Sequence, residues 1–487
     1  MDFTAIYKQS ASLVAFSPAG NLILTAAQDR LIIRRTDTFQ IVRTSAIDAS
    51  PSPTNASLPQ LKALSGDNRI THAAWSSDSE YMLAACARKG VVHVYKLHDE
   101  KWHARVDAGA EGLAKAEWAP DGRSILCFSE WGLRVTIWSL ITGSATYIQF
   151  PLHLDKGALI CVAILALFAK LFLGYAFRSD GRYFVLAERH RSKDTLGLYD
   201  AADGFKLARH FPLPTSSLSS FALSPNGNHL AAWEGPLEYK VFILTLAGEV
   251  LAKFSPDPDP GFGVRNVAWH PSGNFLAVGG WDDKVHILDN LSWSPVRMLE
   301  LSSRIPAGVN VWREPADWLT VTEGRGFLSY EKLPSPHSIT LTKPDHTKPN
   351  PKSGVIQMEW NLTGSFLLVR FETTPTIVHI FDFPAPDAAF VPRLRSLLIH
   401  SRPVRSAKWN PVRKGSLAIC CGSPSLYTWS DEWIGESGSE EEIAECVGVP
   451  AKNFETRDIR WAPDGKGLIL LDKETFCCSF EVEDDNS

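Results

Sequence analysis

A short pattern that recurs along the chain constrains its fold more than any other feature. In its fullest form the pattern is a small apolar residue, an aromatic, a small or polar residue, and then a Pro-containing turn that ends in Gly, as in residues 267–273. Nine copies occur, and their central residues are Phe16, Trp75, Trp118, Phe177, Leu223, Trp269, Trp360, Trp409 and Trp461. Repeated units with a period of about 40–45 residues are typical of propellers, in which each unit forms one four-stranded sheet.

Each copy predicts the same succession of strands. In the unit around Trp269, the aromatic ends an inner strand and packs between neighbouring sheets, and residues 271–273 form a tight hairpin, because Pro fixes φ and Gly accepts a positive φ. A short apolar strand at 275–280 and an alternating strand at 284–289 follow, with a turn between them at Asp282 and Asp283. The sequence therefore predicts an all-β propeller of WD-repeat type with about nine four-stranded blades, in which the eight repeat aromatics are structural core.

The two ends of the chain complement each other. The last unit supplies three strands, near Ile459, Leu468 and Phe476, and residues 3–8 form an extra strand before the first unit. Because a ring of sheets removes its exposed edges by closing, we expect the N-terminal strand to complete the last blade. Residues 1–487 then form a single propeller, most simply one closed ring. Nine units exceed the usual four to eight blades, so a split into two rings stays an alternative.

Several segments depart from the repeat. Residues 46–68 and 295–354 are expected to be irregular excursions, the second an ordered segment without strands, and the acidic stretch 436–442 is expected to be a solvated loop. Residues 158–174 form an apolar insert, and its removal restores the repeat spacing between Trp118 and Phe177. The insert is interpreted as an extra apolar helix or as the translation of an unremoved intron.

The apolar run 158–173 is not expected to cross a membrane. It has sixteen residues with one charge, whereas a spanning helix needs about 20 apolar residues. A span at this place would also leave sheet edges open in or beside the lipid.

Composition excludes several classes of partner and compartment. The formal net charge is −5, with 49 basic and 54 acidic residues, so the chain has no overall basic character for nucleic acid. Eight Cys occur without a CxxC pair, which argues against zinc and disulfides and favours reduced thiols. The first residues lack the pattern of a signal peptide, which favours a cytosolic or nuclear protein.

No constellation of catalytic residues is evident. The chain lacks the nucleophile elbow and the Walker loop, and no histidines stand at a metal-binding spacing. His93, His286 and His379 lie near strand ends and are expected to be core residues. Asp121, Asp180 and Asp464 belong to hairpin turns. We therefore expect no enzyme activity, no catalytic residue, no metal ligand and no cofactor; an enzyme with an accessory propeller would need a second domain that no stretch is left to build.

Several longer strings are similar to one particular family. In order along the chain they are 101–113, 133–140, 186–189, 237–240, 275–279, 283–288, 343–344 and 350–352. With these strings the sequence resembles the centrosomal and spindle-pole-body WD-repeat family, often called WD-repeat protein eight type or the WRAP family. The likeness runs from residue 2 to about 482, interrupted at 46–68 and 158–174.

The resemblance implies a non-enzymatic adaptor at the microtubule-organising centre, in the cytoplasm and cytoskeleton. It implies a coiled-coil spindle-anchoring partner of the SSX-interacting or Msd type and a minus-end-directed kinesin-fourteen, with which the adaptor anchors spindle microtubule minus ends. Neither nucleic acid nor a membrane is expected as a partner, and no partner-binding residue is assigned. A large propeller in translation initiation, or another cytosolic scaffold for protein interactions, is the alternative.

Overall fold

The computed structural model describes residues 1–47, 68–151, 174–344, 352–383, 391–434, 440–451 and 453–481. Nearly all of the expected excursion at 46–68, and the insert at 158–174 apart from Gly174, lie outside the described residues. Within the described part of the chain, no helix is long and apolar enough to cross a membrane.

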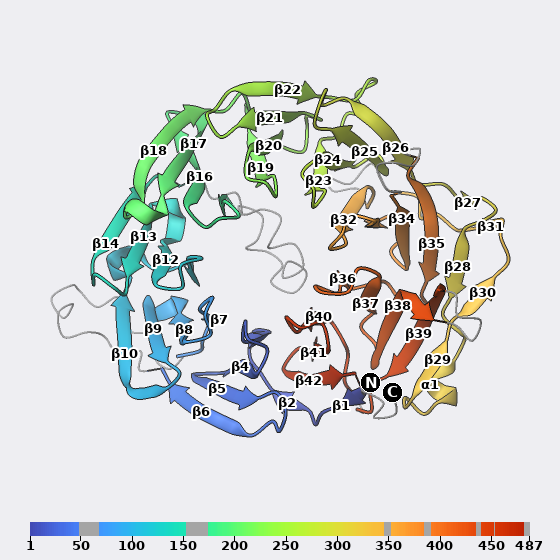
Figure 1. Cartoon of the computed structure of the whole chain (residues 1–487), viewed down its shortest axis with the longest axis horizontal. Helices are drawn as coiled ribbons and strands as arrows, with labels where there is room; N and C mark the ends of the chain where they lie inside the picture. The colour runs from blue at the N-terminus through green and yellow to red at the C-terminus, as the bar shows by residue number, and fades with distance from the viewer. Residues whose placement is uncertain are drawn as a thin grey trace. The chain divides into compact units, whose positions relative to one another are not determined.

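The chain divides into two compact units. The first consists of residues 1–153, 200–206 and 460–487, and the second of residues 154–199 and 207–459. Among the described residues, nine blades are found (Figure 1). Six are four-stranded antiparallel sheets whose strands follow the order of the chain, and the other three are part of larger sheets that also hold strands from elsewhere in the chain. The prediction of an all-β propeller with nine four-stranded blades is confirmed, whereas closure of all nine into a single ring stays a prediction.

The first unit holds three complete blades and nearly all of a fourth. The complete blades are β3 (Val14–Phe16), β4 (Leu22–Ala27), β5 (Arg30–Arg35) and β6 (Ile41–Ala46); β7 (His72–Trp75), β8 (Tyr81–Cys86), β9 (Val91–Lys96) and β10 (Asp99–Asp107); and β11 (Lys115–Trp118), β12 (Ser124–Phe128), β13 (Arg134–Ser139) and β14 (Ala145–Gln149). The fourth consists of β40 (Asp458–Trp461), β41 (Gly467–Leu471) and β42 (Thr475–Phe480), with β1 (Asp2–Phe3) and β2 (Tyr7–Lys8).

The second unit holds the other five blades apart from Asp200 and Lys206. They are β15 (Tyr175–Phe177), β16 (Tyr183–His190), β17 (Lys193–Asp200) and β18 (Lys206–Pro212); β19 (Leu218–Leu223), β20 (His229–Glu234), β21 (Val241–Thr245) and β22 (Val250–Phe254); β23 (Val264–Trp269), β24 (Phe275–Gly280), β25 (Lys284–Asp289) and β26 (Pro295–Glu300); β32 (Val355–Trp360), β33 (Phe366–Phe371), β34 (Ile377–Asp382) and β35 (Arg393–Ile399); and β36 (Ser406–Trp409), β37 (Ser416–Cys420), β38 (Ser425–Ile434) and β39 (Glu440–Gly448).

The N-terminal segment completes the last blade, as the sequence predicts. Both β1 and β2 pair antiparallel with β42, with Phe3 opposite Ser479 and Tyr7 opposite Phe476 (Figure 1). Between them the Thr4 N–H donates to the Cys478 carbonyl at 2.9 Å. The outer edge of β42 is therefore paired, which leaves fewer open backbone groups at the end of this sheet.

The hairpin between the first two strands of a blade carries the Gly that the repeat predicts. In seven blades this Gly has a positive φ, between 63° and 78°, which a residue with a Cβ adopts only with strain. Ser79 takes the same conformation, with φ 64°, in the blade of β7–β10. The blade of β36–β39 closes this turn differently: the Asn410 side chain accepts the N–H groups of Val412 and Arg413, each at 2.9 Å.

The segment 295–354 requires a correction, because its described part contains six strands and a short helix. Residues 295–300 are β26, the outer strand of a blade, and the remainder contains β27 (Arg304–Ile305), β28 (Asn310–Arg313), the helix α1 (Trp318–Val321), β29 (Phe327–Ser329), β30 (Glu331–Leu333) and β31 (His337–Ser338). β28 pairs in parallel with β35 and antiparallel with β30, and β29 pairs with β39 (Figure 1). The outer strands β35 and β39 offer unpaired backbone groups, and these short strands satisfy them.

The apolar core lies between successive blades of a unit. Between the blades of β19–β22 and β23–β26, for example, Trp233, Val241, Val264 and Leu276 are buried in one cluster. The outermost strands are mostly exposed, as in β18, where Phe211 is the one buried residue. The blades without added strands therefore bury the faces of their inner strands and present an outer strand to solvent, whereas β35 and β39 are largely buried or half-buried.

Candidate functional site

The repeat aromatics join neighbouring blades by a recurring hydrogen bond. In five blades the indole N–H donates to a backbone carbonyl of the preceding blade. The acceptor is the residue directly before that blade's own repeat aromatic, or before Leu223 where Leu takes the place of the aromatic. The pairs are Trp75 with Ala15 at 3.4 Å, Trp118 with Ala74 at 3.2 Å, Trp269 with Ala222 at 3.2 Å, Trp360 with Ala268 at 3.2 Å, and Trp409 with Glu359 at 2.9 Å. The indole therefore packs as core and also satisfies a backbone acceptor between two sheets.

The other three repeat aromatics, Phe16, Phe177 and Trp461, lie at the same position, and the two phenylalanines have no N–H to donate. Phe16 is buried, and Phe177 and Trp461 are half-buried. Beside Trp461, the Arg460 side chain donates to the carbonyl of Val14 at 2.6 Å, so a side chain of β40 again reaches the first strand of a neighbouring blade. All eight repeat aromatics thus lie at equivalent positions of their blades, buried or half-buried.

The histidines at the strand ends are core residues. His93, His286 and His379 occupy the same position in the third strands of three blades and are 4%, 8% and 2% exposed. Burial lowers the pKa of His379 to about 3, so its imidazole is neutral at physiological pH. Their equivalence in the repeat explains why these histidines do not gather into a site.

The turn carboxylates have the role that the sequence suggests. Asp121 accepts the backbone N–H groups of Arg123 and Ser124, at 2.9 and 2.8 Å. Asp180 and Asp464 each accept the N–H two residues later at 3.0 Å. These carboxylates therefore fix the hairpin turns.

The described cysteines are buried free thiols. Burial raises the pKa of Cys127 and of Cys477 to about 12. Because the thiolate is the nucleophile and the metal ligand, a thiol with such a pKa is inert at neutral pH.

Two buried carboxylates attach the added strands to the blades of the second unit. The first is Glu442 of β39, whose side chain is 6% exposed. It accepts the indole N–H groups of Trp312 at 2.6 Å and Trp429 at 2.9 Å, the Ser396 hydroxyl at 2.6 Å, and the Asn310 amide at 2.9 Å. The expectation of a solvated acidic loop is therefore wrong for Glu442, which connects β28, β35, β38 and β39.

The second buried carboxylate is Glu314, which directly follows β28. It accepts the Ser401 N–H at 2.6 Å, the Tyr427 hydroxyl at 2.7 Å and the Trp318 indole at 2.8 Å. Burial alone would raise the pKa of Glu314, but these hydrogen bonds outweigh burial and hold the pKa below its ordinary value. Glu314 is thus an ionised anchor for α1 and for the blade of β36–β39.

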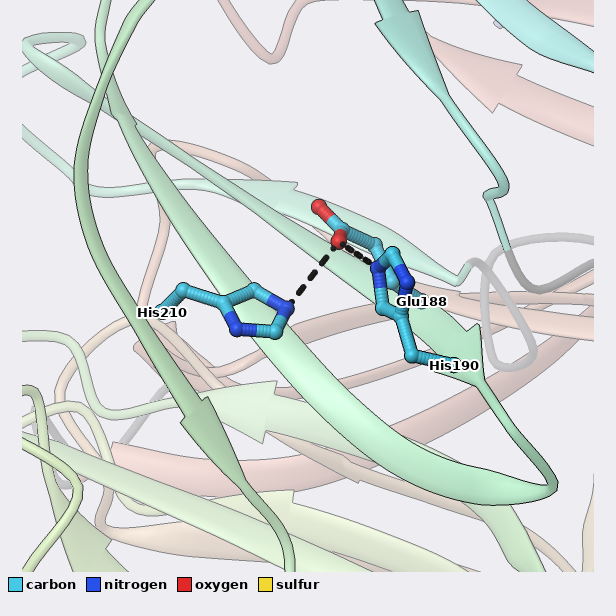
Figure 2. A group of neighbouring side chains, drawn as sticks. All are labelled: Glu188, His190 and His210. Carbon is cyan, nitrogen blue, oxygen red and sulfur yellow. Dashed lines mark hydrogen bonds and ion pairs between the residues drawn. The ribbon is translucent and has the colours of Figure 1, made fainter.

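A different group of titratable side chains lies on one face of the blade of β15–β18. Glu188 and His190 stand two residues apart on β16 and therefore point to the same side of the sheet, and His210 comes from β18 (Figure 2). The Glu188 Oε2 atom lies 2.8 Å from His190 Nε2 and 3.2 Å from His210 Nε2. Figure 2 shows both imidazole rings turned toward this one oxygen, and their planes are nearly perpendicular, at 85°.

The sequence pattern singles out no metal ligands, and this group is a candidate that the pattern does not reveal. Among the described residues, Glu188, His190 and His210 form the one group of three potential ligands whose ligand atoms all lie within 4.8 Å of one another. The signal in the sequence is weak, because it consists of a Glu-x-His pair on a strand and a His twenty residues later. Only the pairing of the strands shows that the three residues meet.

The chain is similar to known WD-repeat proteins. The family model of the WD domain, G-beta repeat, matches residues 249–289, which correspond to one repeat unit. The mouse (Mus musculus) WD repeat-containing protein WRAP73 is 32% identical over 500 residues, covering 99% of this chain and 96% of the mouse protein. The chain belongs to the WRAP73 family of WD-repeat proteins. The family resemblance seen in the sequence is thereby confirmed.

Two further similarities are more distant. An uncharacterized WD repeat-containing protein of Schizosaccharomyces pombe (strain 972 / ATCC 24843) is 20% identical over 512 residues, covering 100% of this chain and 94% of that protein. Among solved structures, the C-terminal WD40 domain of Sif2 matches 92% of this chain and 99% of its own, with a TM-score of 0.48 and 11% identity. The relationship to the WRAP73 family thus rests on sequence along the full length of the chain.

Proposed function

We propose that the protein is a non-enzymatic adaptor at the microtubule-organising centre, the spindle pole body or centrosome. The observation that carries this proposal is the 32% identity to WRAP73 over 99% of the chain, which makes it a WD-repeat scaffold of that family. The pole location comes from the resemblance of the strings distributed along the sequence. A rigid array of blades suits this role, because it presents broad surfaces on which a helix or an extended peptide can lie.

The partners in this proposal are a coiled-coil spindle-anchoring protein of the SSX-interacting or Msd type and a minus-end-directed kinesin-fourteen. With them the scaffold holds spindle microtubule minus ends at the pole. Outer strands such as β18 and β22 are largely exposed, so binding surface is available without any change in the core. The alternative, a large propeller in translation initiation or another cytosolic scaffold, predicts different partners.

Imaging of the tagged protein in mitotic cells tests the proposal. The tag belongs at the C-terminus, because Asp2 and Phe3 already pair with β42. We expect foci at both spindle poles, loss of the foci when the coiled-coil partner is depleted, and recovery of that partner with the purified protein. Diffuse cytoplasmic signal together with sedimentation with ribosomes would contradict the pole adaptor and favour the translation alternative.

A matched pair of variants separates a lost surface from a lost fold. Trp131 is 91% exposed, whereas Trp118 in the same blade is half-buried and bonded to Ala74. We expect Trp118→Ala to lower the amount of folded protein and the foci together. Trp131→Ala is expected to leave the amount of folded protein unchanged, so a change in its foci reports on partner binding alone.

A further inference from the structure

We propose that Glu188, His190 and His210 bind a divalent transition-metal ion, for which zinc is the best match, on the blade of β15–β18. This inference does not rest on the proposed adaptor role. The ligand set is one carboxylate oxygen and two imidazole nitrogens, which suits zinc and related ions better than calcium or magnesium.

The distances between the three ligand atoms fit a metal ion after a small relaxation. Zinc binds nitrogen and carboxylate oxygen at about 2.0–2.2 Å, which places neighbouring ligand atoms of a tetrahedral site roughly 3.3 Å apart. Glu188 Oε2 lies 2.8 Å from His190 Nε2 and 3.2 Å from His210 Nε2. A shift of the two imidazole rings by a few tenths of an ångström would bring the ligand atoms to the tetrahedral spacing. The rings have room to move, because the side chains of His190 and His210 are 41% and 34% exposed.

The buried carboxylate is fixed before any ion arrives. The Glu188 side chain is 3% exposed, and its other oxygen accepts the Tyr199 hydroxyl from β17. Burial, together with the bond to Glu188, raises the pKa of Tyr199, so the hydroxyl stays protonated and remains a donor. Hydrogen-bonded carboxylates of this kind are typical of the shell that orients metal ligands.

A glycine makes room for this arrangement. A Cβ atom at position 197 would overlap Glu188 Oε1 and the Tyr199 ring, so the sheet accommodates the buried carboxylate because Gly197 has no side chain. Arg189 bonds to Asp194 at 2.7 Å. Its charge is therefore already paired with an acid other than Glu188.

Three protein ligands leave a coordination position that faces solvent. Zinc sites with three protein ligands usually hold a water molecule or another ligand in the fourth position. The ion would connect β16 with β18 across the intervening β17, and it would offer a coordination point to a donor side chain of a bound protein. Because binding favours the folded state, the ion is also expected to stabilise the blade.

Metal titration of the purified full chain tests the inference. The protein carries a tag without histidine, is treated with EDTA, and is titrated with Zn²⁺ by calorimetry and with Co²⁺ by absorption spectroscopy. We expect one site per chain, tetrahedral Co²⁺ bands of high intensity, and a rise in melting temperature with Zn²⁺. His190→Ala and His210→Ala are each expected to weaken binding at least tenfold and to abolish the Co²⁺ bands.

The control is His103→Ala, which removes an exposed histidine from the outer strand β10 of another blade. We expect it to bind both ions like the wild type. The melting temperatures of all variants without metal establish that the fold is retained. Absence of a one-to-one site in the wild type, or equal binding by the wild type and the His190→Ala/His210→Ala double variant, would overturn the proposal. Neither result bears on localisation at the spindle pole, so the adaptor role is tested separately.

Discussion

Two neighbouring regions of the second unit are built from the same repeat but are held together differently. The blade of β23–β26 is a plain four-stranded sheet, joined to the preceding blade by the indole of Trp269. The blades of β32–β35 and β36–β39 carry β28, β29 and β30 as well, added to their outer edges. The plain blade is specified by its own repeat, whereas the two widened blades also need residues from a distant segment.

The difference lies in where the polar groups are buried. At the plain blade the recurring polar contact is a hydrogen bond from the indole of Trp269 to a backbone carbonyl. Weakening this one bond lowers the free energy of unfolding only slightly. At the widened blades two carboxylates, Glu314 and Glu442, sit under the added strands and each receive several donors. A buried charge is tolerated only when its partners are in place, so the widened region is stable as a whole or not at all.

The largest expected effect is therefore at Glu442. Glu442→Ala removes the acceptor of two indole N–H groups and of the Ser396 hydroxyl, and each buried donor left unpaired costs about 1–3 kcal/mol. We expect the free energy of unfolding to fall by about 4 kcal/mol or more, measured by denaturant unfolding. Glu441→Ala, at the exposed neighbouring position, is the control, and we expect a change within about 0.5 kcal/mol. Equal effects of the two substitutions would show that the carboxylate does not hold the added strands.

A smaller effect concerns pH, because both regions bury a histidine at the same repeat position. His379 lies in a widened blade with a pKa of about 3 against 6.5 unfolded, so the unfolded chain takes up the proton first as pH falls. The contribution of the neutral His379 to the free energy of unfolding is complete above about pH 6.5 and is lost progressively as the pH falls toward 3. From pH 7 to pH 5 we expect the wild type to lose about 2 kcal/mol more than His379→Leu.

The matching substitution in the plain blade sharpens the contrast. Burial also lowers the pKa of His286, but this residue is 8% exposed against 2% for His379. His286→Leu should therefore flatten the pH dependence less than His379→Leu, when unfolding is measured at both pH values. A larger effect of His286→Leu would mean that the plain blade, and not the widened one, excludes water more completely.

Sequence reasoning succeeds where the fold repeats itself. The aromatic positions, the glycine turns and the pairing of the first residues with the last blade follow from local patterns that recur, since each blade must present the same faces to its neighbours. The repeated position of His379 and its equivalents is buried for the same reason. Because the pattern appears nine times, the positions shared by the copies can be recognised even where one copy departs from the pattern.

Sequence reasoning fails where contacts join segments that do not repeat. The strands β27 to β31 have two to four residues each, too few for a visible alternation. Glu442 stands in an acidic stretch that looks solvated, and only the tertiary arrangement supplies its donors. Glu188 and His210 meet because of the pairing of β16, β17 and β18, which determines which side chains share a face.

The smallest effect is expected at the joint between the two regions, where Trp360 of β32 donates to Ala268 of β23 at 3.2 Å. Trp360→Phe keeps most of the packed ring but removes this hydrogen bond, so we expect a loss of about 1 kcal/mol in the free energy of unfolding. Trp269→Phe should cost the same, because it removes the same bond from the plain blade. Trp433→Phe is the control, since Trp433 is 58% exposed. A loss of several kcal/mol for Trp360→Phe alone would mean that the widened blades are joined to the plain blade by more than the common repeat contact.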